Sequence, residues 1–198
     1  MDKLLDKIIE EMKKDNALTD NKENEEIVRV GLEILITKVF FAIAILIVGL
    51  LMKCFFESIV FAISFSMLRE YGGGYHAESR TKCLVLSFIT LVVALGIIVL
   101  NKIFHVLMLP TFILSIISVI YILYKAPIDT LNKRLDKDEI RVYGNKARIL
   151  TIIMFLVAVL LLYIRYNNLA FAVLTGIIME AYLMIKGQIQ NFRYGDEQ

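Results

Sequence analysis

One short stretch of the chain, Arg69–Cys83, combines residue types that could do covalent chemistry. It holds three consecutive glycines at 72–74, followed by His76 and then by Cys83. A cysteine in the first turn of a helix lies at the positive end of the helix macrodipole, which favours the thiolate. A nearby histidine can act as the general base that activates a thiol. The pattern therefore predicts a cysteine nucleophile.

The spacing of these two residues requires a bend. In a straight helix, His76 and Cys83 would be separated by about 10.5 Å along the axis, too far for a hydrogen bond. Glycines lack the Cβ that hinders a sharp turn or a close backbone approach. We therefore expect the segment to fold back, with the next helix beginning near Ser79 or Thr81 and offering its unpaired N–H groups to an oxyanion. The alternative interpretation is a flexible turn with bystander residues.

The elements that position this loop are predicted to be membrane helices. Of the 198 residues, 58% are apolar, and the mean hydropathy is +0.69. Soluble domains are roughly 45–50% apolar, so this composition excludes a soluble enzyme, a disordered chain and a disulfide-stapled secreted module. The net charge of +2 is too small for a nucleic-acid binder.

Six mostly apolar segments come near the roughly 20 residues that a helix needs to cross a bilayer. They are continuously apolar, whereas β-barrel strands alternate between apolar and polar residues. We predict an all-α polytopic membrane protein with six transmembrane helices, at about 32–52, 54–68, 84–100, 103–123, 149–164 and 169–185. Ahead of them, apolar residues at helical spacing predict an amphipathic helix on the membrane surface or on the bundle: Leu4, Leu5, Ile8, Ile9 and Met12.

Lys and Arg are distributed unevenly between the two ends of these helices. Eighteen fall on one face, and only Lys53, Lys102 and Arg165 fall on the other. Because cytoplasmic loops carry the excess of Lys and Arg, both termini are predicted to be cytoplasmic. The predicted organisation is a cytoplasmic or interfacial segment at 1–29, a transmembrane domain at 30–185 with the catalytic loop at 69–83, and a cytoplasmic tail at 186–198.

Three charged residues, Lys38, Glu57 and Glu180, fall within the predicted spans. An isolated charge there costs at least about 2.5 kcal/mol, so each needs a partner or water. Lys38 and Glu180 are expected at similar depths, and we predict that they pair. In the alternative, Lys38 reaches the interface and Glu180 faces a wet cavity. Because such charges can line a path through the bilayer, an alternative function is a small transporter or peptide exporter without proteolytic activity. A membrane scaffold without chemistry is a third class.

Neither a metal nor a cofactor is expected. A zinc site needs three or four ligands, and the predicted topology separates Cys54 and His105, at the outer face, from His76 and Cys83. The same separation argues against a disulfide between the two cysteines. No Walker-type phosphate loop is present.

The catalytic loop resembles the signature of the AgrB family. Residues that match the family pattern lie within the loop and in two other places: Arg69, Gly73, Gly74, His76, Ala77 and Cys83, then Gly31-Leu32-Glu33 and Ala126-Pro127. The resemblance runs over roughly residues 25–165, and only the loop is specific.

The resemblance implies a function and a set of roles. AgrB proteins are membrane-embedded cysteine endopeptidases of Gram-positive bacteria that act in quorum sensing, as homodimers. By this resemblance Cys83 is the nucleophile, His76 is the general base, and Arg69, Gly73 and Gly74 support them. The implied substrate is an AgrD-like precursor with an amphipathic leader, a central signal segment and a charged tail. Cleavage before the tail, through a thioester, leads to a cyclic lactone or thiolactone, with the active site at the cytoplasmic side of the cell membrane.

Overall fold

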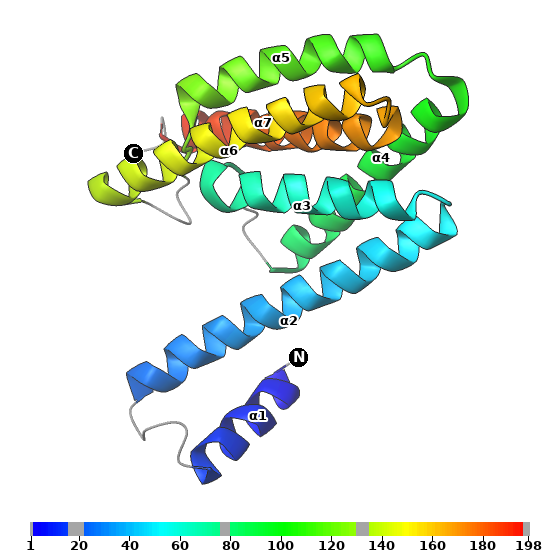
Figure 1. Ribbon diagram of the computed structural model, residues 1–198. Coiled ribbons are helices and arrows are strands. Elements are labelled where there is room, and N and C mark those ends of the chain that lie inside the picture. Colours follow the sequence, from blue (N-terminus) through cyan, green and yellow to red (C-terminus); the bar gives the residue numbers. More distant parts are fainter. Residues whose placement is uncertain (1, 16–21, 76–79, 130–134, 196–198) are drawn as a thin grey trace. The chain divides into compact units, whose positions relative to one another are not determined.

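The computed structural model describes residues 2–15, 22–75, 80–129 and 135–195. Over these residues the chain is all-α, with seven helices (Figure 1). The helices are α1 (Asp2–Lys14), α2 (Lys22–Leu51), α3 (Phe55–Gly72), α4 (Arg80–Phe104), α5 (Met108–Lys125), α6 (Lys137–Tyr163) and α7 (Asn167–Gly195).

Each of the six predicted spans falls on one of the helices α2–α7. Five of them, α2, α4, α5, α6 and α7, are long and apolar enough to cross a membrane. The helix α3 is not among the five, and its 18 residues include Glu57, Arg69 and Glu70, which a lipid-exposed helix holds only at considerable cost. The chain is therefore a membrane protein with five candidate spans, and a sixth span at α3 stays a prediction.

Two helices begin away from the predicted starts of their spans. The fourth span was placed from residue 103, but α4 continues to Phe104 and α5 begins at Met108. Pro110 suits this later start, because the first turn of a helix does not need the N–H that proline lacks. The fifth span was placed from residue 149, but α6 already begins at Lys137. There the Asp136 N–H donates to the Glu139 carboxylate at 3.1 Å, as in a capping box.

The chain packs as two units, of which the first covers Met1–Ala44. It contains the predicted amphipathic helix, α1, in which Leu5 and Ile9 are buried. Two ion pairs join α1 to the beginning of α2: Lys13–Glu25 at 2.7 Å and Arg29–Asp6 at 2.9 Å. Pairs this exposed contribute little, typically under about 1 kcal/mol each.

The second unit, Ile45–Gln198, is built around α7. This helix packs against α3, α4, α5 and α6, and 67% of its most apolar stretch is buried, against at most 22% in the other candidate spans. Burial is continuous from Ala170 to Ile177. The helix α7 is therefore the central helix of this unit, while its neighbours keep apolar sides for lipid.

Two apolar clusters form around α7. In the first, Leu68 of α3, Ile122 of α5 and residues of α6 surround Leu174 of α7. In the second, Phe61 of α3 and Leu95 of α4 pack with residues of α7. Fully burying a side chain of this size contributes about 1.5–3 kcal/mol. The clusters hold α3 against α7 along its length, so the two ends of α3 have fixed surroundings.

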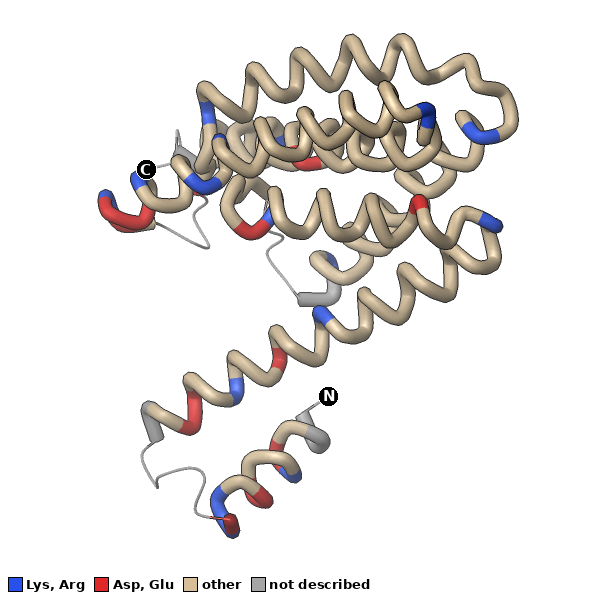
Figure 2. Tube along the Cα trace, in the orientation of Figure 1, with Lys and Arg blue, Asp and Glu red and all other residues tan. Residues whose placement is uncertain are grey.

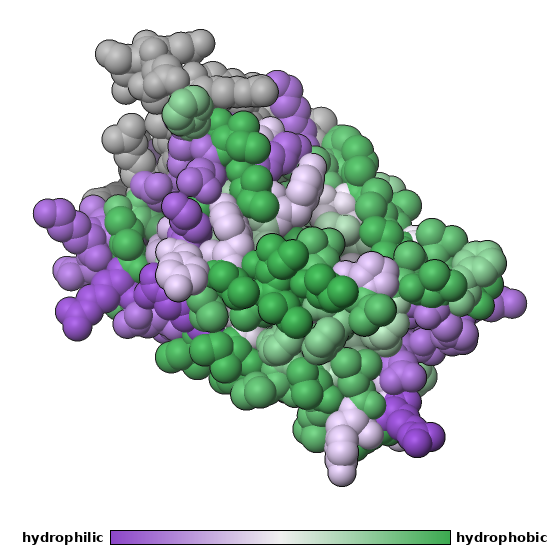
Figure 3. Space-filling view, turned by 90° about the horizontal axis from the view of Figure 1, so that it is seen from above, coloured by the Kyte–Doolittle hydropathy of each residue, from purple (hydrophilic) through white to green (hydrophobic). Residues whose placement is uncertain are grey.

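The surface of the molecule fits a membrane protein. Most charged residues of the helices of the second unit lie near the helix ends (Figure 2). Figure 3 shows a face with a broad hydrophobic area across its middle and hydrophilic side chains toward its edges. On α5, large apolar side chains such as Leu109, Ile113 and Ile117 are exposed, as expected where lipid replaces water.

Candidate functional site

The helix α3 ends in a turn that favours glycine. Gly73 has φ 75° and Gly74 has φ 103°, and both values lie where an L side chain is strained. Residues 72–75 are called the glycine loop below. These two glycines therefore end α3, while the predicted fold-back that would bring His76 to Cys83 involves residues 76–79, outside the described residues, and stays a prediction.

The glycine loop pairs with the residues that follow α5. The Gly74 N–H donates to the Ile128 carbonyl at 2.9 Å, and the Ile128 N–H donates to the Gly72 carbonyl at 3.0 Å, so that a parallel β-bridge joins Gly73 to Ile128. A Cβ on Gly73 would collide with the Ile128 carbonyl oxygen. Because Ile128 directly follows Ala126-Pro127, the fold brings together two of the segments that carry the family resemblance.

The glycine loop is also bound to α7. The Tyr75 N–H donates to the Leu183 carbonyl at 2.9 Å, and the Lys186 ammonium lies 4.6 Å from the centre of the Tyr75 ring, a cation–π distance. A Cβ on Gly187 would come within 2.6 Å of the Tyr75 nitrogen. The backbone directly before residue 76 is therefore held between α7 and the segment after α5.

The Arg69 side chain holds the glycine loop at its carbonyl groups. From the last turn of α3, its guanidinium donates to the carbonyl of Gly73 and to that of Tyr75, the latter at 2.5 Å. Hydrogen bonds from a charged donor are stronger than neutral ones. The Glu180 carboxylate of α7 lies 4.0 Å from the same guanidinium, and its side chain is fully buried.

Residues 126–129 are in turn held by α6 and α7. Arg148 donates to the Leu123 carbonyl at 2.9 Å and to the Ala126 carbonyl at 3.1 Å. The Asn191 amide donates to the Asp129 carbonyl at 2.7 Å. Helices α3, α5, α6 and α7 therefore all contribute to the position of the glycine loop.

The structure places one of the two predicted catalytic residues. Cys83 is the fourth residue of α4, which begins at Arg80, within the window expected from the sequence. Its side chain is exposed, and the thiol is free. His76 lies outside the described residues, so the contact between imidazole and thiol stays a prediction. The structure describes the backbone directly before His76 and the start of α4, where Cys83 lies.

The ion pair predicted between Lys38 and Glu180 involves both units. Lys38 belongs to the first unit and Glu180 to the second, so their pairing stays a prediction. Within the described part of the second unit the cation next to Glu180 is Arg69, a partner not predicted from the sequence. A signal was present in the sequence, because Arg69 directly follows the predicted end of the second span and Glu180 lies near the end of the sixth span that is predicted to be cytoplasmic.

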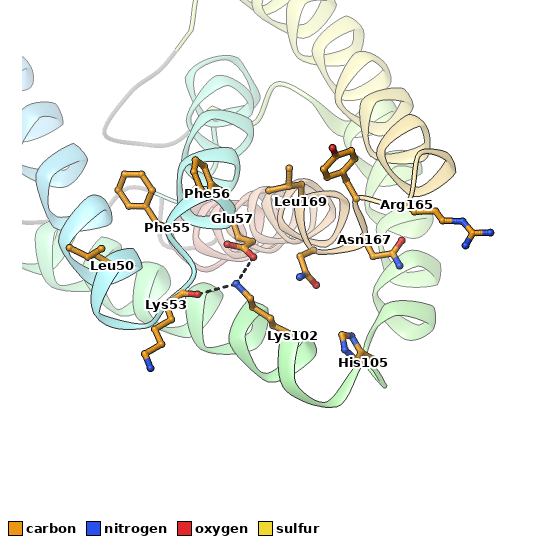
Figure 4. A pocket seen from close by; sticks show the side chains of 12 residues that line it. Leu50, Lys53, Phe55, Phe56, Glu57, Lys102, His105, Arg165, Asn167 and Leu169 are labelled. Carbon is orange, nitrogen blue, oxygen red and sulfur yellow. Dashed lines mark hydrogen bonds and ion pairs between the residues drawn. The ribbon is translucent and has the colours of Figure 1, made fainter.

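A pocket of about 790 Å³ lies at the other end of α3 (Figure 4). The three basic residues predicted for the outer face, Lys53, Lys102 and Arg165, all line it. Lys102 donates to the Glu57 carboxylate at 2.8 Å and to the Lys53 carbonyl at 3.0 Å. In Figure 4 the charged ends of Lys53 and Arg165 point away from Glu57.

The second cysteine lies at this end of α3 and differs from the first. Cys54, between two pocket residues, is free and fully buried. Burial raises the pKa of the Cys54 thiol, and the Glu57 carboxylate adds to the rise, with Lys102 acting in the opposite direction. A thiol kept protonated is a poor nucleophile. Among the described residues, no three His, Cys, Asp or Glu side chains gather as metal ligands.

Comparison with known proteins places the chain among relatives. The family model described as accessory gene regulator B matches residues 5–184. An AgrB-like protein of Clostridium perfringens strain SM101 is 28% identical over 197 residues, which cover 96% of this chain and 90% of the relative. AgrB-like protein 2 of C. perfringens strain 13 is 33% identical over 171 residues, with 83% and 78% covered. No solved structure matches.

Proposed function

Since the chain belongs to the accessory gene regulator B (AgrB) family, we propose that it is a membrane-embedded cysteine endopeptidase. Membership of the family implies a role in the processing of autoinducing peptides. The proposed reaction removes the C-terminal tail of an AgrD-like precursor and leads to a cyclic lactone or thiolactone for quorum sensing. The observation that supports it most is that the loop carrying the family signature is held by backbone hydrogen bonds up to the residue before His76.

In the proposed mechanism, Cys83 is the nucleophile and His76 is the general base. His76 takes the thiol proton, the sulfur bonds to the carbonyl carbon of the scissile peptide bond, and the C–N bond breaks as His76 returns the proton to the leaving amine. The signal segment stays on Cys83 as a thioester. An internal cysteine or serine of the peptide then attacks the thioester, which closes the ring and restores the Cys83 thiol. Water must be excluded, because it would hydrolyse the thioester instead.

Two described features suit this chemistry. Cys83 lies in the first turn of α4, the part of a helix whose N–H groups can stabilise an oxyanion. The glycine loop restricts the backbone that leads into His76, and a general base acts only within about 2.6–3.2 Å of its proton. Both features serve a reaction between His76 and Cys83.

We place the active site at the cytoplasmic face of the cell membrane of a Gram-positive bacterium. The pocket with the three predicted outer cations lies beside Glu57, whereas the glycine loop begins at Gly72. These two residues are about 22 Å apart along α3, by the rise of an α-helix. The glycine loop therefore lies at the end of α3 opposite those cations, in agreement with the positive-inside rule. The homodimer is proposed from the family resemblance.

An exporter without proteolytic activity has less support. Such a protein would use buried charges along one path through the bilayer. Glu57 and Glu180 instead lie toward opposite ends of α3, and each has a cationic neighbour in the second unit.

The test is cleavage of an AgrD-like precursor peptide, with an epitope tag on its tail, by the purified protein in lipid vesicles. We expect the wild-type protein to release the tail and to carry the remaining peptide on Cys83, seen by mass spectrometry. Cys83→Ala should abolish release at an unchanged thermal midpoint, while Cys54→Ala, the matched control, should keep it. Release by Cys83→Ala at the wild-type rate would contradict the proposal.

The proposed orientation can be tested separately with a membrane-impermeant maleimide on intact cells. In a Cys83→Ser background, the buried Cys54 should not react. A cysteine at the exposed position 167 should be labelled from outside, and one at the exposed position 137 should be labelled only after lysis. The opposite pattern would invert the topology and remove a cytoplasmic precursor as the substrate.

A further inference from the structure

The buried carboxylate of Glu180 takes no part in the mechanism above. Its side chain has 0% exposure, and within the described part of the chain neither of its oxygens accepts a hydrogen bond. A buried carboxylate in this state destabilises the fold unless its charge is compensated. The cation that compensates it is Arg69, at 4.0 Å.

Arg69 lies between this carboxylate and the glycine loop. Its guanidinium donates to the carbonyls of Gly73 and Tyr75 and also faces Glu180. The planar guanidinium carries five donors in a fixed arrangement, so one side chain can serve a carboxylate and two carbonyls together. The position of the loop is thereby coupled to a charge on α7.

Gly72 allows the carboxylate to lie this close to the end of α3. A Cβ at position 72 would come within 2.5 Å of Glu180 Oε1 and within 3.4 Å of the carboxyl carbon. Any other residue at position 72 would therefore displace the Glu180 side chain. The first glycine of the triplet thus makes room for Glu180, while the other two adopt the positive φ values of the turn.

We propose that Glu180 is a positioning residue of the peptidase: it holds Arg69, and Arg69 holds the backbone that leads into His76. The inference rests on the proposed function because it takes His76 as the general base. Glu180 is too deeply buried to contact the substrate, so it acts only through Arg69.

Removal of the charge alone should loosen the loop without unfolding it. Without the carboxylate, Arg69 has no buried counter-ion, and its side chain, already 23% exposed, can turn toward water or lipid headgroups. The loop then loses two hydrogen bonds to Arg69 and keeps three backbone bonds, to Ile128 and Leu183. The imidazole is presented less often in its reactive position, which lowers the rate and leaves substrate binding largely intact.

The first experiment compares Glu180→Gln with Glu57→Gln, a matched change at a buried, ion-paired acid at the opposite end of α3. We expect Glu180→Gln to lower kcat for tail release at least tenfold with KM within threefold of wild type, and Glu57→Gln to change neither by more than twofold. A folded Glu180→Gln with the wild-type kcat would overturn the inference, and so would an equal loss in both variants.

The second experiment reads the loop directly by hydrogen exchange, without substrate. The amides of Gly74 and Tyr75 are bonded to Ile128 and Leu183, so they should exchange slowly in the wild-type protein in vesicles. In Glu180→Gln their exchange should accelerate at least fivefold, with no change in the middle of α7. Unchanged exchange of the Gly74 and Tyr75 amides would overturn the inference.

The third experiment uses geometry and holds even if Glu180→Gln folds poorly. Gly72→Ala should lower kcat because its methyl group displaces the carboxylate. Glu180→Asp keeps the charge but shortens the side chain by one C–C bond, about 1.5 Å, and should lower kcat as well. The kcat of the double variant should be at least three times that of either single variant, since the methyl group added by Gly72→Ala fills the space that the shorter acid leaves. A double variant no better than the worse single would overturn the inference.

The two proposals fail in different ways. If the wild-type protein does not release the tail, or Cys83→Ala releases it normally, the proposed function is wrong, whatever hydrogen exchange shows. If the wild-type protein cleaves and Cys83→Ala does not, but Glu180→Gln cleaves at the wild-type rate, only the role of Glu180 is wrong.

Discussion

The second unit has two buried acids with cationic partners toward opposite ends of α3, and the two pairs are built differently. Lys102 bonds directly to Glu57 at 2.8 Å beside an open pocket. Arg69 lies 4.0 Å from Glu180 and uses its donors on backbone carbonyls. Lys102 gives one hydrogen bond to its acid and one to the Lys53 carbonyl, whereas Arg69 gives two hydrogen bonds to carbonyls of the glycine loop. The difference suggests that one end neutralises charge and the other positions a loop.

The largest difference is expected when the cation is removed from each pair. Arg69→Met leaves Glu180 buried and unpaired, which typically costs about 3–5 kcal/mol, and it removes both bonds to the glycine loop. We expect cleavage to fall roughly 100-fold, equivalent to about 2.7 kcal/mol in the barrier. Lys102→Met should cost only about 1–2 kcal/mol, because the pocket admits water to Glu57, and cleavage should persist. The thermal midpoint and the initial rate of tail release measure both effects, and similar losses in the two variants would abolish the distinction.

A smaller effect is expected from a methyl group in the glycine loop. Gly74→Ala places a Cβ 2.8 Å from the Leu183 carbonyl oxygen and 2.9 Å from an Arg69 nitrogen, at φ 103°. The strain should be about 1–3 kcal/mol, with cleavage lowered at least tenfold. Gly96→Ala is the control, because a Cβ there meets no atom within 4 Å, and in a helix it should stabilise by about 0.5–1 kcal/mol. If Gly74→Ala changes only the melting temperature, the loop is a structural turn.

A third comparison lies within α7. Asn191→Ala removes the hydrogen bond to the Asp129 carbonyl and should cost about 1 kcal/mol, with a two- to fivefold slower release of the tail. Gln188→Ala removes the hydrogen bond that the Tyr121 hydroxyl donates to the Gln188 side chain, a bond that does not involve the backbone of residues 126–129, and should leave the rate unchanged. Equal rates in the two variants would show that this segment does not support the glycine loop.

The smallest effect concerns the predicted Lys38–Glu180 pair. Because Glu180 already has Arg69 as a neighbour, any coupling with Lys38 should be under about 1 kcal/mol. The measurement is a charge cycle in detergent with Lys38→Met, Glu180→Met and the double change. A double variant that melts no higher than the worse single variant would show that the two residues do not pair.

Much of this protein follows from local sequence properties. Continuous apolar runs, helical spacing in residues 4–12 and the glycine triplet predicted the membrane helices, the amphipathic α1 and the turn after α3, because each depends on residues close in the chain. The start of α4 near Cys83 followed in the same way. The helices α5 and α6 begin at Met108 and Lys137 and not at 103 and 149, because apolarity marks the lipid-facing stretch, whereas capping groups and turn residues end the helix itself.

The partners of the glycine loop could not be read from the sequence. Nothing in the local sequence marks these partners. Helix packing brings the backbones of Ile128 and Leu183 within hydrogen-bonding distance of residues 72–75, and it brings Gly187 into close contact with them. The same holds for Glu180, because helix packing determines which cation lies next to its carboxylate. The sequence by itself determined the class of molecule, the signature loop and the reactive residue types, since these rest on composition and short-range spacing. Only the tertiary structure decided which distant backbone and charge hold that loop, because such contacts exist only once the helices have packed.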